Sequence, residues 1–203
     1  MAHMTPLPEG ATLALQDTFD LMRAILGFVP NSVLTMQRKP AIVAGFGALT
    51  RGVMDPAGEV DLGFKRLVAH MASHGAGCQY CEAHALIAAG IHGIPDDKLA
   101  AVWDYERSPL FSEAEKAALA FAQCAGAVPN AVTPDVFARL RAHWSEGQIV
   151  EILGVVCLYG FLNRWNDSMA TTLEDAPRAA GERFLAGKTA WTGGKHIADG
   201  EAE

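Results

Sequence analysis

The sequence has little positive charge, few aromatic residues and only four cysteines among its 203 residues. Its 16 Lys and Arg stand against 23 Asp and Glu, so no basic stripe is available for a phosphate backbone. This balance excludes nucleic acid as an expected partner and disfavours an anionic membrane surface. No apolar run reaches the roughly 20 residues that a bilayer-spanning helix needs, and the start lacks the charged and apolar regions of a signal peptide. We expect a cytoplasmic protein that contacts no membrane.

The composition favours an all-α fold. Half of the residues are hydrophobic while only 8% are aromatic, which is more typical of packed helices than of a β-sandwich. The length suits one compact domain. We place this domain at residues 4–180, with an N-terminal section at 4–58 and a core with the paired cysteines at 59–180. Residues 181–203 are expected to be a tail that is partly flexible or packs against another subunit.

Periodicity and capping signals divide the chain into helices. The expected helices cover 12–27, a short segment between Pro30 and Pro40, 41–54, 61–76, 78–89, a segment after Pro95, and three helices that follow Ser112, Thr133 and Ser145. Ser112 with Glu115, and Ser145 with Gln148, have the spacing of capping boxes. The last of these helices is apolar nearly all round, which predicts a central position in the bundle.

Two of the four cysteines, Cys78 and Cys81, occur close together in the stretch SHGAGCQYCEAHA. In a reducing compartment such a pair is more typical of redox catalysis or metal binding than of a structural disulfide. The glycines before it end one helix, so the pair falls at the start of the next. A helix N-terminus lowers the pKa of a thiol, and two cysteines in a first turn can supply an attacking and a resolving sulfur.

His84 follows Cys81 by three residues, or about one helical turn. We therefore interpret His84 as a base for Cys81, with Cys78 as the disulfide partner. The helix dipole alone favours Cys78 as the more acidic thiol, so the pattern leaves open which sulfur attacks. Cys124 and Cys157 lie on apolar helical faces and are interpreted as small core residues.

Several other polar residues allow both a functional and a structural interpretation. His70 and His74 share a stripe with Arg66 and are either proton-relay groups or a solvated helix face. Glu151 is expected at the exposed end of its helix, with a buried carboxylate of raised pKa as the alternative. The cluster NRWND at 163–167 is expected to lock helices together through Arg164 and an acid, with a pocket lining as the alternative.

A zinc site is the weaker alternative for the cysteine pair. Cys78, Cys81 and His84, together with His74 or His70, supply suitable donor atoms. However, donors at steps of three on one helix spread over about 120° of its surface. The sequence also offers no second close cysteine pair to complete a tetrahedral site.

Three segments, LGFVPNSVLTM, FKRLVAHMASHGAGCQYCEAH and YGFLNRWNDSMATTLE, together resemble the carboxymuconolactone decarboxylase superfamily on its AhpD-like, peroxidase-related side. The resemblance covers about residues 26–175. It implies an AhpD-like helical bundle that forms homo-oligomers, and a redox-active pair at Cys78 and Cys81 that reduces organic hydroperoxides without a bound cofactor or metal. In AhpD the oxidised pair is re-reduced by a lipoyl-bearing partner, which implies an external dithiol or lipoyl-type reductant here.

This chain departs from the AhpD pattern at two positions. Arg66 stands where the pattern has a glutamate, and Ala85 stands where it has a histidine, which leaves His84 displaced by one residue. His70 is therefore a second candidate base. The resemblance implies a thiol-dependent peroxidase. A general disulfide reductase or redox sensor, and a non-catalytic helical module with vestigial or metal-binding cysteines, are the alternatives; lactone decarboxylation is disfavoured because it works without the cysteine pair.

Overall fold

The computed structural model describes residues 2–198, and this range contains helices and turns but no strand. The α-helices are α1 (Gln16–Leu26), α2 (Asn31–Met36), α3 (Pro40–Val53), α4 (Leu62–Ala76), α5 (Gln79–Ile91), α6 (Asp96–Ala101), α7 (Glu113–Gly126), α8 (Pro134–Arg141), α9 (Glu146–Met169) and α10 (Asp175–Phe184). Short 3-10 turns lie at Glu9–Ala11, Leu13–Leu15, Val102–Asp104 and Gly194–His196. The expected all-α class is confirmed.

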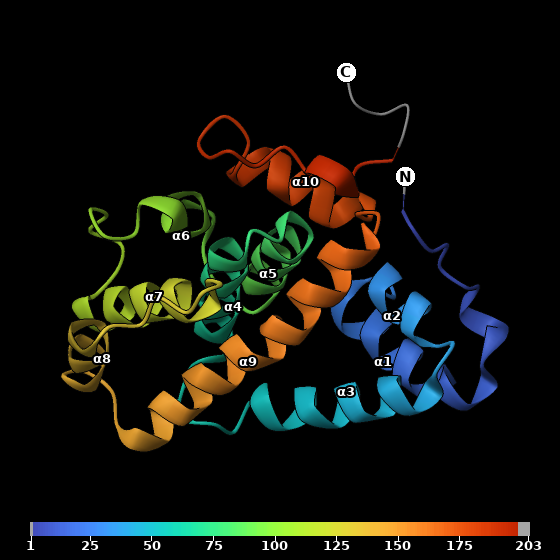
Figure 1. Cartoon of the computed structure of the whole chain (residues 1–203), viewed down its shortest axis with the longest axis horizontal. Helices are drawn as coiled ribbons and strands as arrows, with labels where there is room; N and C mark the ends of the chain where they lie inside the picture. The colour runs from blue at the N-terminus through green and yellow to red at the C-terminus, as the bar shows by residue number, and fades with distance from the viewer. Residues whose placement is uncertain (1, 199–203) are drawn as a thin grey trace.

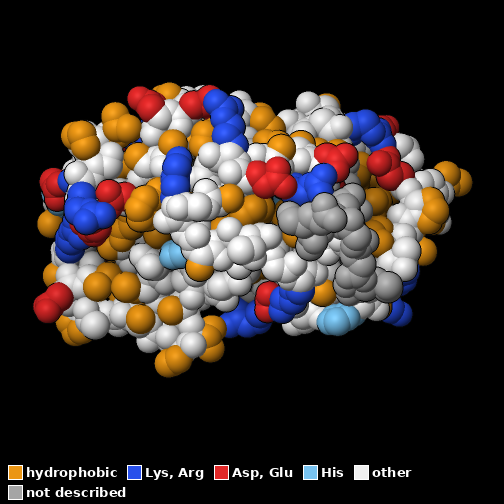
Figure 2. Space-filling model, turned by 90° about the horizontal axis from the view of Figure 1, so that it is seen from above, with side chains coloured by type: hydrophobic (Ala, Val, Ile, Leu, Met, Phe, Trp, Pro, Cys, Tyr) orange, Lys and Arg blue, Asp and Glu red, His pale blue; other side chains and the backbone are white. Residues whose placement is uncertain are grey.

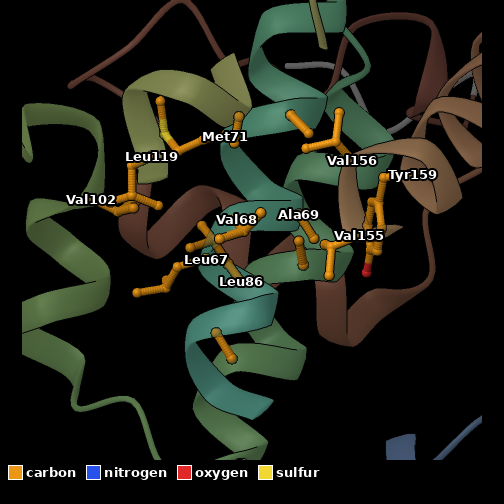
Figure 3. Packing of buried hydrophobic residues seen from close by; sticks show 14 of the residues in the cluster. Leu67, Val68, Ala69, Met71, Leu86, Val102, Leu119, Val155, Val156 and Tyr159 are labelled. Atoms are coloured by element: carbon orange, nitrogen blue, oxygen red, sulfur yellow. The ribbon is translucent and has the colours of Figure 1, made fainter. Parts of the chain in front are cut away.

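Helix α4 lies at the centre of the fold and packs against α5, α7 and α9. Buried side chains of these helices converge in one core with Val102 of a 3-10 turn. Figure 3 shows Leu67, Val68, Ala69, Met71, Leu86, Val102, Leu119, Val155, Val156 and Tyr159 of this core. Helices α1–α3 lie on one side of the long helix α9, and α6–α8 lie on the other (Figure 1). The N-terminal section has its own smaller core around Phe19, Val33 and Val43.

Most helix starts occur where the capping signals predict them. Ser112 with Glu115, and Ser145 with Gln148, form complete capping boxes, and Thr133 caps α8. The first helix differs, because α1 begins at Gln16 and the 3-10 turn Leu13–Leu15 occupies the start of the range expected to be helical. Local capping therefore determines most element boundaries, while the N-terminal turns carry no such signal.

Helices α4 and α7 cross with their backbones in direct contact. A Cβ atom at Gly75 would lie 2.1 Å from the carbonyl oxygen of Gln123, and one at Gly126 would lie 2.2 Å from that of Ala72. Both distances are far below van der Waals contact, so the crossing requires glycine at both positions. This contact fixes the end of α4, from which the chain turns into α5.

We expect Gly75→Ala to lower the free energy of unfolding by about 3 kcal/mol, because the added methyl group must push two helices apart. Gly47→Ala in α3 is the matched control, since its Cβ would meet only the end of Arg51 at 3.6 Å. That control should raise the stability by up to about 1 kcal/mol through helix propensity. Urea unfolding of both variants measures the difference, and equal stabilities would contradict the close crossing.

Helix α9 is central but is not covered on all sides. Val150, Leu153 and Phe161 are exposed on it, and Leu49 is exposed on α3, which packs against α9. Cys157 is also exposed and Cys124 is only partly buried, so the expectation that both are core residues is wrong. An apolar helix contains more apolar positions than its neighbours in one chain can cover, and Cys157 falls on the uncovered side.

Within residues 2–198, α9 is the one helix long and apolar enough to cross a membrane by length and composition. The core helix of a bundle meets the same criterion, and α9 packs against α3, α4, α5, α7 and α8.

The carboxylate of Glu151 is part of an ion pair that joins α9 to α4. The ammonium nitrogen of Lys65 lies 2.7 Å from Glu151 Oε2, and the Lys65 side chain is only 1% exposed. The backbone N–H groups of Glu59 and Val60 also donate to this carboxylate. Burial opposes its ionisation, yet Lys65 and these donors hold the pKa of Glu151 below its usual value. Neither expected reading of Glu151 included this pairing.

The segment after α9 folds back over the start of α5. Helix α10 spans the expected boundary at residue 180, and the indole of Trp191 donates to the carbonyl oxygen of Gln79 at 3.0 Å. His196 is buried, with Nδ1 2.8 Å from the carbonyl oxygen of Thr171. Residues 181–198 thus pack on their own chain, whereas 199–203 lie outside the described residues. Figure 2 views this side, where acidic and basic side chains are interspersed.

Candidate functional site

A cavity of about 170 Å³ lies between the N-terminal helices and the central helices. Its apolar lining consists of Met22, Ile25, Leu26, Pro30, Val33, Phe46, Ala88 and Leu162, and its polar lining consists of Ser32, Thr50, Arg66, Tyr80, Cys81, His84, Tyr159 and Asn166. Most of the apolar lining comes from α1–α3, and most of the polar lining comes from α4, α5 and α9, which form the polar end of the cavity. A cavity of about 150 Å³ can hold a benzene ring, so this space fits one small ring with substituents.

The two cysteines lie at the start of α5, as the sequence predicts. Cys78 is the N-cap residue, and its N–H donates to the carbonyl oxygen of Ser73. Both thiols are free, buried and close enough to hydrogen-bond to each other. They differ in access: Cys81 lines the cavity, whereas Cys78 does not.

The environment of Cys81 is apolar, and it does not favour the thiolate. Burial raises the pKa of Cys81 well above its ordinary value, and the neighbouring Cys78 thiol raises it further. The amide of Asn166 opposes this, because its Nδ2 donates to Cys81 Sγ at 3.3 Å. The expectation that the helix N-terminus lowers this pKa is therefore wrong for the resting site, because burial outweighs the partial charge of the helix end.

This pKa predicts how the thiol reacts with iodoacetamide. In a variant that retains only Cys81, we expect the alkylation rate to rise about tenfold per pH unit from about pH 7 to about pH 9, because the thiolate fraction is still growing throughout that range. Asn166→Ala should be slower at every pH, since the hydrogen bond that lowers the pKa is lost. Stopped-flow or mass-spectrometric rates measure both effects, and a plateau below about pH 8 would contradict the raised pKa.

Asn166 belongs to the cluster that was expected to lock helices together. The structure supports the alternative reading for this residue, because Asn166 lines the cavity and contacts Cys81. Arg164 does not pair with an acid in the described structure; it donates to the carbonyl oxygen of Gly160 on its own helix.

His84 lies in the same cavity as Cys81, but its ring nitrogens are directed elsewhere. Nδ1 lies 3.0 Å from the carbonyl oxygen of Tyr80, and Nε2 lies 2.9 Å from Glu174 Oε2. This arrangement differs from the expected base for Cys81, because both nitrogens already face oxygen atoms.

Glu174 connects three parts of the site and was missed by sequence reasoning. It accepts hydrogen bonds from the hydroxyl of Tyr80 at 3.0 Å and from the N–H of Asn31, while its other oxygen faces His84. Burial opposes its ionisation, but His84 and these donors hold its pKa below the usual value. Glu174 in the stretch TTLED is a weak signal, since only the fold brings it to α5.

His70 and His74 lie around a different residue. Nδ1 of His70 is 3.1 Å from the carbonyl oxygen of Glu82, and Nδ1 of His74 is 3.6 Å from Glu82 Oε1. Burial lowers the pKa of His70, whereas the Glu82 carboxylate raises that of the partly exposed His74. Neither histidine lines the cavity. The assignment of His70 as an alternative base remains a prediction.

The donors considered for zinc are not gathered at one point. Within residues 2–198, no group of three or more His, Cys, Asp and Glu side chains is arranged to hold a metal ion.

Comparison with known proteins identifies the family. The profile of the carboxymuconolactone decarboxylase family matches residues 40–123, which include α4, α5 and both cysteines. Debrominase Bmp8 has a similar structure in its apo form, with a TM-score of 0.84 and 34% identity over 89% of this chain and 96% of that one. The chain belongs to the carboxymuconolactone decarboxylase family.

Further similar proteins include a ligand complex of Bmp8 and two uncharacterized proteins. Bmp8 was also solved in complex with 2,3,4-tribromopyrrole, at 33% identity to this chain. An uncharacterized peroxidase-related protein from Silicibacter has a TM-score of 0.73 and 20% identity over 86% of this chain and 92% of its own, which shows the AhpD-like fold alone. The uncharacterized protein YnjA of Escherichia coli is 32% identical over 45% of this chain, and the match spans half of YnjA.

Proposed function

We propose that this protein is a thiol-dependent reductase in which Cys81 attacks the substrate and Cys78 then forms a disulfide with it. One observation carries this assignment: Cys81 lines the cavity, whereas Cys78, its hydrogen-bond neighbour, does not. A substrate in the cavity therefore meets Cys81 first. The oxidised sulfur of Cys81 is next to the second thiol, which resolves it.

The proposed substrate is a small halogenated aromatic ring. The apolar lining and the volume suit one ring, and the debrominase with its bound tribromopyrrole is similar to this chain over nearly the whole length of both. In the net reaction the carbon–halogen bond breaks, and the ring carbon gains a hydrogen. The two thiols lose two electrons and become a disulfide, and one halide ion and one proton are released.

Reduction of an organic hydroperoxide is the second candidate. Arg66 and Tyr159 provide hydrogen-bond donors at the polar end of the cavity, where a departing alkoxide needs them. Here the O–O bond breaks, one thiol forms a sulfenic acid, and the other displaces water to give the same disulfide. The raised pKa of Cys81 applies equally to both candidates, because the thiolate is the nucleophile in either attack.

In both reactions an external dithiol or a lipoyl-type reductant reopens the disulfide by thiol exchange. We also propose that the chain forms a homo-oligomer, as the resemblance implies.

A direct comparison of two substrates, assayed separately, tests the proposal. The reduced protein is incubated with excess dithiothreitol and either a bromopyrrole or cumene hydroperoxide, and released bromide or consumed peroxide is measured. We expect bromide release that saturates with substrate and exceeds the rate with dithiothreitol alone. Faster saturable consumption of the hydroperoxide would favour the second candidate, and no catalysis of either reaction would contradict the proposed function.

A further inference from the structure

Arg66 brings an uncompensated positive charge to the cavity. Its guanidinium donates from one terminal nitrogen to the hydroxyl of Tyr159 at 3.4 Å, which is a long contact. Its Nε is buried and has no hydrogen-bond partner. Across residues 2–198, no carboxylate lies within ion-pair distance of it, in contrast to Lys65 with Glu151 and Arg139 with Glu106.

The residues around Arg66 leave this charge available to a ligand. Burial raises the pKa of Tyr159 despite the nearby guanidinium, so its hydroxyl stays protonated at neutral pH and can donate. Burial and Arg66 together lower the pKa of His92 at the end of α5.

An unpaired guanidinium in a partly desolvated site is costly, and an anionic ligand offsets the cost. The planar guanidinium and the Tyr159 hydroxyl can both donate to one negatively charged atom. The rest of the lining is apolar, so the ligand has one charged edge and an apolar body. Phenols and pyrroles match this description, because electron-withdrawing halogens make their O–H or N–H acidic.

We propose that Arg66 and Tyr159 bind the ionised hydroxyl or ring nitrogen of an acidic aromatic substrate, and so orient its ring against Cys81. The identity of the ligand as a substrate rests on the proposed function, whereas the preference for an anion is a property of the cavity alone. Arg66 is then a specificity-determining residue that selects the anion over its neutral analogue.

Binding of 2,4,6-tribromophenol and of its methyl ether, 2,4,6-tribromoanisole, tests this proposal. The first is an anion above the pKa of its hydroxyl, and the second is a neutral ring of nearly the same shape. Calorimetry with the unreactive Cys81→Ser variant should give about 10- to 100-fold tighter binding of the phenolate, as expected for charge-assisted hydrogen bonds. The ether should bind weakly.

Arg66→Met should remove this preference by weakening phenolate binding about 10- to 100-fold while leaving ether binding unchanged. Arg66→Lys retains the charge and should restore part of the preference, which also controls for folding. Equal binding of both ligands by the parent, or an equal loss of both in Arg66→Met, would overturn the proposal. Because binding is measured without turnover, a lack of debromination would contradict the proposed function but would not contradict this anion site.

Discussion

Cys81→Ser is expected to reduce substrate turnover to the rate of free dithiol, whereas Cys78→Ser should complete one reaction per chain and then stop. The serine hydroxyl at 81 is a far weaker nucleophile than a thiol, so no attack occurs. With Cys78 replaced, Cys81 still reaches the substrate, but its oxidised sulfur has no second thiol in the chain with which to form the disulfide. Rapid-quench assays without external reductant should give one product per chain for the wild type and Cys78→Ser, and none for Cys81→Ser.

Intact mass gives an independent readout of the same assignment. After one turnover the wild type should lose two hydrogens through a disulfide between Cys78 and Cys81. Cys157→Ser and Cys124→Ser are the matched controls, because neither residue lines the cavity, and both variants should behave as the wild type. A first turnover in Cys81→Ser that is absent in Cys78→Ser would reverse the two roles.

The sequence predicts the helices and the cysteine pair because these features depend on neighbours along the chain. Capping boxes and helical periodicity act within one or two turns, and two cysteines in one first turn are necessarily close. The fold class, most helix starts and the position of Cys78 at the start of α5 could therefore be read without a structure.

The chemical environment of the pair could not be predicted, because it is supplied by distant segments. Asn166 contacts Cys81 across 85 positions of sequence, and Glu174 contacts Tyr80 across 94. Helix-terminus reasoning favours a lowered thiol pKa, while the tertiary structure buries Cys81 and reverses the direction. His84 similarly has helical spacing to Cys81, yet the carboxylate of Glu174 determines where its ring points.

The raised pKa of Cys81 applies to both proposed substrates. A buried thiol is poorly prepared for attack on either of them until a base takes its proton. An ionised aromatic ring carries a negative charge, and Arg66 at the polar end of the cavity can donate a hydrogen bond to the charged atom. The anion site and the buried thiol are thus consistent with the same class of substrate.

The ion pair of Lys65 and Glu151 is distant from this chemistry but holds the central helices together. The ammonium group of Lys65 donates to the carbonyl oxygen of Val53 at 3.0 Å as well as pairing with Glu151. The carboxylate in turn accepts from the N–H groups that precede α4. Since the pKa of Glu151 is lowered, its stabilisation is present above the ordinary carboxyl pKa and is lost as the pH falls through the lowered value.

Glu151→Ala is therefore expected to lower the free energy of unfolding by about 3–5 kcal/mol at neutral pH, because it leaves the almost fully buried Lys65 ammonium without its counter-charge. The double variant Lys65→Met with Glu151→Ala should recover part of this loss, since no charge is then buried alone. Glu146→Ala removes an exposed ion pair with Arg141 and should cost no more than about 1 kcal/mol. Urea unfolding of the wild type, Lys65→Met, Glu151→Ala and the double variant gives the coupling energy. A Glu151→Ala loss as small as the Glu146→Ala loss would show that water reaches Lys65.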